Sequence, residues 1–78
     1  MGKMSNSKEF NEFYDRVCKN IKSELKFRGI VYKQIASYLN ISEPQFANKI
    51  NAHEARFNIL DLKKIAAYLK MSTDMLLK

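Results

Sequence analysis

The sequence has few of the residues that break or cross-link a chain. Among its 78 residues are two glycines, one proline, one cysteine and one histidine. So little glycine and proline argues against a turn-rich β fold. The single cysteine, Cys18, cannot form an intrachain disulfide, and with His53 as the only histidine the usual zinc ligand sets are missing. We therefore expect a protein that is not an enzyme and that holds no metal or cofactor.

Long apolar stretches and an excess of acidic residues are also missing. No run is long enough to span a bilayer, and residues 1–8 are too polar for a signal peptide. We therefore expect a cytoplasmic protein that does not enter membranes. The formal net charge is +6 and the pI is near 9.6, which favours a polyanionic partner such as nucleic acid.

Apolar residues recur at helical spacing through the first third of the chain. We expect residues 1–6 to be a disordered tail and a first helix to run from Ser7 to Arg28, ended by Gly29. Its apolar stripe comprises Phe10, Phe13, Tyr14, Val17, Ile21 and Leu25.

Four shorter helices follow in the same pattern, and we identify no internal repeat. They are expected over residues 32–39, from after Ser42 to Asn51, over 59–70 and over 73–77. Asn40 tolerates the left-handed backbone that ends a helix, and Ser42 with Gln45 forms a capping box. The fold class is therefore all-α, a compact five-helix bundle that makes a single domain of residues 7–78.

Four sequence segments resemble one family of DNA-binding domains. They are Gln34-Ile35-Ala36, Leu39-Asn40-Ile41-Ser42, residues 62–69 (LKKIAAYL) and residues 71–76 (MSTDML), in that order. In order and spacing they are similar to the helix-turn-helix domains of the lambda-repressor and Cro type, the Xre family. The resemblance covers about residues 25–77. It implies a helix-turn-helix between Val31 and Asn51, sequence-specific binding of double-stranded DNA and a regulatory role, usually repression.

The resemblance also assigns candidate contacts. Glu43, Gln45 and Asn48 would face base edges, because asparagine and glutamine can pair with adenine and a glutamate can accept from cytosine. A second group would contact the DNA backbone: Tyr32, Lys33, Gln34, Lys49, Asn51, His53, Arg56 and Asn58. The chain departs from the family pattern at Val31, where a polar cap is usual, and at Asn40, where glycine is usual.

The residues leave more than one function open. Residues 30–58 carry three basic and two acidic groups, whereas residues 1–29 carry seven and four, so the positive charge is not concentrated on the candidate reading helix. A protein-interaction or antitoxin-like adaptor on the same fold is therefore the alternative, with binding of acidic membranes through the first helix as a third reading. A homodimer, formed on DNA or before it, is expected because one such domain covers a half-site.

Overall fold

The computed structural model describes the backbone of residues 2–51 and 55–78, and the side chains from residue 11 onward within those ranges. Within these ranges it contains five α-helices: α1 (Gly2–Arg28), α2 (Tyr32–Tyr38), α3 (Glu43–Asn51), α4 (Ile59–Tyr68) and α5 (Thr73–Leu77). No strand occurs in the described ranges. The predicted all-α, five-helix architecture is confirmed.

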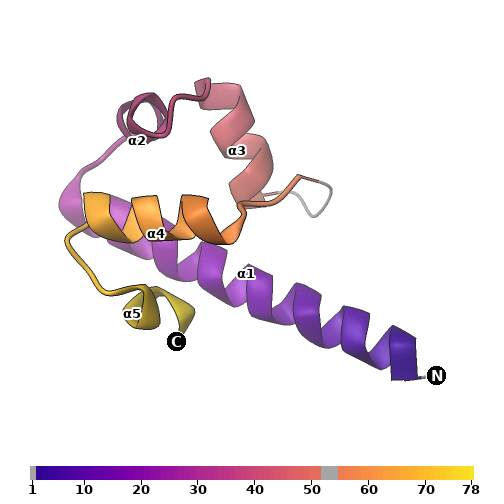
Figure 1. Ribbon diagram of the computed structural model, residues 1–78. Helices are drawn as coiled ribbons and strands as arrows, with labels where there is room; N and C mark the ends of the chain where they lie inside the picture. The colour runs from indigo at the N-terminus through magenta and orange to yellow at the C-terminus, as the bar shows by residue number, and fades with distance from the viewer. Residues whose placement is uncertain (1, 52–54) are drawn as a thin grey trace.

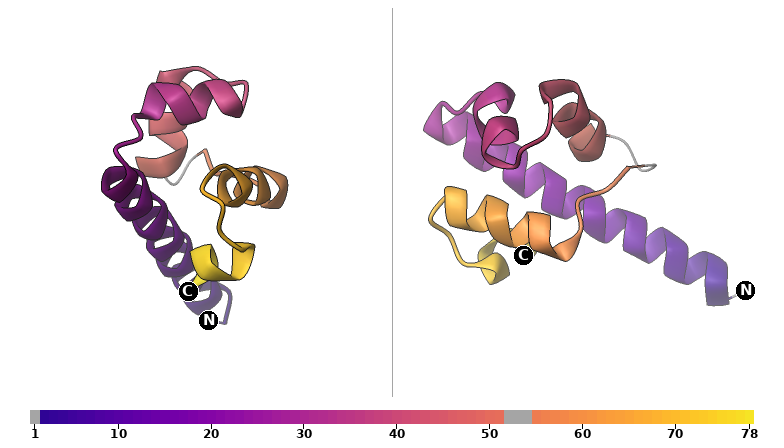
Figure 2. Two further views of the ribbon diagram at one scale, coloured as in Figure 1. Left: turned by 90° about the vertical axis from the view of Figure 1, so that its left-hand side faces the viewer. Right: turned by 45° about the horizontal axis from the view of Figure 1, so that its top comes forward.

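The long helix α1 forms the base on which the other four are arranged (Figure 1). From the side, α1 lies opposite α4, with α2 and α3 above them and α5 below (Figure 2). The N-terminal half of α1 runs past the rest of the bundle, so the molecule measures 41 × 24 × 20 Å along its principal axes. Helix α2 packs against α3 and α4, and α5 packs against α1 and α4.

Helix α1 begins earlier than the sequence indicates. It starts at Gly2 rather than at Ser7, so residues 2–6 belong to the helix in the structure instead of forming a separate tail. The physical reason is that no proline or other strong helix breaker separates Gly2 from Ser7. The predicted end at Arg28 is correct, and Gly29 follows it with a positive φ of 68°.

One continuous core holds the five helices together. Each helix contributes at least one side chain with almost no exposure, among them Ile21, Ile35, Phe46, Ile65 and Leu76. Within the described ranges no polar or charged residue is classed as buried. The predicted stripe of α1 supplies Tyr14, Val17, Ile21 and Leu25 to this core, while Phe13 packs at its edge.

The turns that end α2 and α4 have the same backbone path. After α2, the amides of Asn40 and Ile41 donate back to the carbonyls of Ser37 and Ala36, at 3.1 and 3.0 Å, and Asn40 has φ 62°. After α4, the amides of Lys70 and Met71 donate to the carbonyls of Ala67 and Ala66 at 3.1 and 2.9 Å, and Lys70 has φ 56°. Both are Schellman endings, in which a left-handed residue stops the helix. They end α2 and α4 at Tyr38 and Tyr68 rather than at Leu39 and Lys70.

This shared path reveals a repeat, contrary to the expectation of none. At an offset of 30 residues the two segments have identical residues at six positions: Lys33/Lys63, Ile35/Ile65, Ala36/Ala66, Tyr38/Tyr68, Leu39/Leu69 and Ser42/Ser72. The serines cap α3 and α5 alike, accepting from amides three residues later at 3.2 and 3.3 Å. The equivalent tyrosines Tyr38 and Tyr68 pack on each other with ring centroids 4.8 Å apart. The α2–turn–α3 and α4–turn–α5 units therefore share one helix ending and one serine cap, although α3 has nine residues and α5 has five.

Candidate nucleic-acid interface

Helix α3 is fixed to the core on one side and exposes polar groups on the other. Phe46 and Ile50 are buried, and the Phe46 ring lies between the rings of Tyr32 and Phe57, at centroid distances of 5.0 and 5.3 Å. Such aromatic pairs add to the stability that area burial provides. The same helix leaves Glu43, Gln45 and Asn48 exposed, so the three predicted base-contacting residues lie on the outward side of a firmly packed helix.

The first turn of α3 carries the predicted capping box. The amide of Gln45 donates to Ser42 Oγ at 3.2 Å, and the amide of Ser42 donates to Gln45 Oε1 at 2.8 Å. A backbone amide can only donate, so the atom facing it must be the side-chain oxygen of Gln45. The cap therefore orients the side-chain amide of Gln45, with its oxygen directed toward the backbone amide of Ser42.

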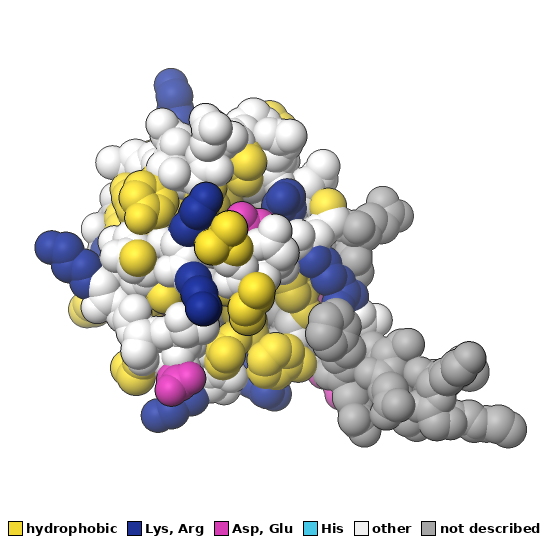
Figure 3. Space-filling view, in the orientation of Figure 1, with side chains coloured by type: hydrophobic (Ala, Val, Ile, Leu, Met, Phe, Trp, Pro, Cys, Tyr) yellow, Lys and Arg dark blue, Asp and Glu magenta, His cyan; other side chains and the backbone are white. Residues whose placement is uncertain are grey.

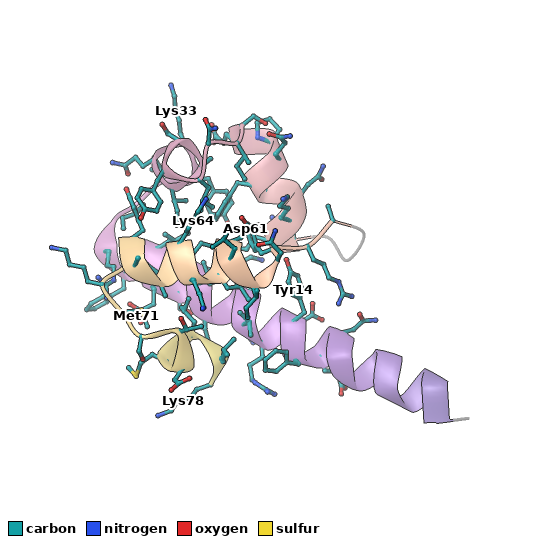
Figure 4. All side chains as sticks on the ribbon, in the orientation of Figure 1. Tyr14, Lys33, Asp61, Lys64, Met71 and Lys78 are labelled. Carbon is teal, nitrogen blue, oxygen red and sulfur yellow. The ribbon has the colours of Figure 1, made fainter. Side chains whose placement is uncertain are left out.

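An open hollow lies beside this cap, between α2 and the start of α3. Its volume is about 450 Å³, and the residues that line it are Lys33, Ser37, Asn40, Ile41, Ser42, Glu43 and Gln45. It brings together two predicted base-contacting residues and one predicted phosphate-contacting residue from different helices. Lys33 projects from α2 away from the bundle (Figure 4), so its ammonium group can meet an anion at the rim.

The other two predicted contacts at the start of α2 are partly engaged within the protein. The amide of Val31 donates to Gln34 Oε1 at 2.9 Å, which supplies half of a capping box where the Val31 side chain offers no acceptor. Tyr32 is half-buried against Phe46, and burial raises the pKa of its hydroxyl. Of the three predicted residues, Lys33 is the charged one, and its side chain points outward.

At the end of α3, contacts inside the protein engage one of the predicted residues, Lys49. The Lys49 ammonium lies 3.9 Å from the carboxylate of Asp61 on α4. The Lys49 carbonyl accepts a 2.6 Å hydrogen bond from the Tyr14 hydroxyl. Asn51 is the exposed last residue of α3, and His53 lies outside the described residues.

Two predicted phosphate contacts after α3 have structural roles as well. Arg56 stacks over the Tyr14 ring, 5.0 Å from its centroid, and donates a hydrogen bond to Asn11 Oδ1. Asn58 is the N-cap of α4: its Oδ1 accepts from the amide of Asp61 at 2.7 Å, and Asp61 accepts from the amide of Asn58 at 3.2 Å. Arg56 is therefore directed to α1 and Asn58 to the start of α4.

Tyr14 joins these pieces, and the sequence indicated only that its ring is apolar core. Its hydroxyl donates to the Lys49 carbonyl and accepts from the amide of Phe57 at 2.9 Å. In Figure 4 it rises from α1 toward the segment between α3 and α4. Burial raises the pKa of this hydroxyl well above its ordinary range. One buried side chain therefore bonds both the end of α3 and the segment that precedes α4. No local sequence pattern indicates that Tyr14 has these two backbone partners.

Positive charge is not concentrated at this candidate interface. Lys and Arg side chains are scattered over the face shown in Figure 3 and do not gather over α2 and α3.

In the described part of the chain, no three His, Cys, Asp or Glu residues are placed to hold a metal ion. No helix there has the length and apolar character required to cross a bilayer.

The chain matches no protein-family model, no curated protein and no solved structure.

Proposed function

We propose that this protein binds double-stranded DNA in a sequence-specific way and acts in the cytoplasm as a transcriptional regulator, a repressor of phage or mobile-element type. The observation that supports this most is α3: Phe46 and Ile50 anchor it, while Glu43, Gln45 and Asn48 are exposed together on it. Its nine residues span about 13 Å. A helix of this size fits the major groove, whose base edges carry a distinct donor and acceptor pattern for each base pair.

The hollow beside the Ser42–Gln45 cap supplies the phosphate contact of this proposal. Lys33 at its rim would meet the DNA backbone while the first turn of α3 meets the bases. One domain covers one half-site, so a homodimer on a two-fold operator would place two α3 helices about 34 Å apart. Sedimentation with and without a site duplex measures this pairing.

Selection from random duplexes at near-physiological salt tests the proposal directly. We expect a motif to be enriched, and Gln45→Ala and Asn48→Ala each to cost about 1–3 kcal/mol on that motif. Lys33→Ala is expected to weaken binding to all DNA sequences alike and to lower the salt dependence of that binding. Lys19→Ala removes the same charge from an exposed position on α1, outside the candidate helix-turn-helix, and is the matched control. Enrichment of no motif would contradict sequence-specific binding.

An adaptor or antitoxin-like protein on the same fold is the second candidate. Exposed apolar side chains favour this candidate. Phe27 at the end of α1 is 88% exposed, and two consecutive residues at the start of α4, Ile59 and Leu60, are 63% and 56% exposed. Such residues are common at protein interfaces. Retention of duplexes that is sequence-blind and lost with salt would favour this candidate, because it would show charge attraction without base readout.

A further inference from the structure

The cap at the start of α3 restricts what Gln45 can offer to a base. A glutamine amide carries one acceptor oxygen and a nitrogen with two donor hydrogens. Here the oxygen is 2.8 Å from the amide of Ser42 and the nitrogen is left at the other end of the group. Gln45 is exposed and lines the hollow between α2 and α3. The oxygen, which can accept two hydrogen bonds, has one taken by the Ser42 amide and is directed toward it, so the end of the side chain that the cap leaves unengaged is the nitrogen with its two donor hydrogens.

We infer that Gln45 reads guanine, with its Nε2 hydrogens donated to the O6 and N7 acceptors, rather than adenine. This inference rests on the proposed DNA binding and sharpens it. Adenine presents one acceptor and one donor in the major groove, so pairing with both requires a donor and an acceptor from the side chain. Guanine presents two acceptors, which suits a group whose oxygen is already engaged. Thymine offers a single acceptor beside its methyl group and is a poorer match.

Glu43 in the same turn has the opposite polarity. Its ionised carboxylate can only accept, and it lines the same hollow as Gln45. The cytosine paired with a guanine offers an N4 donor in the major groove. A donor at Gln45 and an acceptor at Glu43 therefore match the two strands of a G·C pair or of two neighbouring pairs.

Selection of duplexes by the wild-type protein and three variants tests this inference. Gln45→Lys keeps a donor, Gln45→Glu offers only an acceptor, and Gln45→Ala offers neither. Glutamate at this position preserves the capping box, and thermal unfolding of each variant verifies that α3 is still folded. We expect the wild type and Gln45→Lys to select guanine at one position of the motif. We expect Gln45→Ala to lose that preference by roughly 5- to 150-fold and Gln45→Glu to disfavour guanine there.

The outcomes separate this inference from the proposed function. A motif in which the base that depends on Gln45 is adenine would overturn donor-only reading and leave sequence-specific binding intact. A motif that is unchanged in Gln45→Ala would do the same. If the wild type enriches no motif, the proposed function fails and the inference fails with it.

Discussion

Replacing Tyr14 by phenylalanine tests the junction between α1, α3 and α4. The change keeps the buried ring and removes the hydroxyl that bonds the Lys49 carbonyl and the Phe57 amide at 2.6 and 2.9 Å. Each lost partner leaves a backbone group without its bond, at a cost of about 1–3 kcal/mol when the group is buried. Tyr14 is only 6% exposed, so we expect a loss of roughly 2–4 kcal/mol in the free energy of unfolding. For a domain of this size that lowers Tm by roughly 8–30 °C.

Circular dichroism during thermal and urea unfolding measures this loss. Tyr38→Phe is the matched control, because Tyr38 is 49% exposed and phenylalanine preserves the ring that packs on Tyr68; we expect a change within about 0.5 kcal/mol. Hydrogen exchange adds a local readout, since the Phe57 amide should exchange faster in Tyr14→Phe. A loss below about 0.5 kcal/mol with unchanged exchange at Phe57 would refute the role assigned to the hydroxyl.

Three further predictions concern pH and the helix ends. Burial raises the pKa of Tyr14 above its ordinary value of about 10, so its contribution to stability is complete below that pH and is lost as pH rises through the folded-state pKa. Alkaline titration of unfolding should therefore show a shallower decline in Tyr14→Phe than in the wild type; equal slopes would contradict this. Lys70→Gly should raise stability by about 0.5–1 kcal/mol, because lysine is strained at φ 56°. Asn40→Gly should raise stability by less, since asparagine tolerates φ 62°. Equal increases in stability for the two variants in urea unfolding would contradict the strain argument. Asn58→Ala should cost about 1 kcal/mol through loss of the α4 cap, and unchanged urea unfolding would count against that cap.

The helix order and most helix ends could be predicted because local chemistry determines them. Ser42, Asn58 and Ser72 cap the three helices that the sequence placed after them. Gly29 and Asn40 take the left-handed backbone expected of them. The left-handed Lys70 could not be predicted in this way, because lysine has no intrinsic preference for that conformation and the surrounding turn imposes it.

The candidate site could be predicted only as far as helix periodicity reaches. The resemblance assigned Glu43, Gln45 and Asn48 to base edges, and the structure has all three exposed on α3. The partners of Arg56 and Tyr14 lie 45 and 35 residues away in the chain, so they depend on tertiary packing that a local pattern does not encode. For the same reason, nothing local indicated that Arg56 is directed toward α1.

The two copies of the turn show which residues specify the backbone path and which only form the surface. The first are shared by both units, and the second differ between them. The shared Ile, Ala, Leu and Ser residues set the path of both units. Around that path, the first unit exposes Ser37, Asn40 and Gln45, whereas the second exposes Ala67, Lys70 and Met75 at the equivalent positions. At these three positions the scaffold thus carries polar, uncharged side chains in one half and apolar or basic ones in the other. Its surface chemistry can change during evolution in either half while the few residues that specify the fold stay the same.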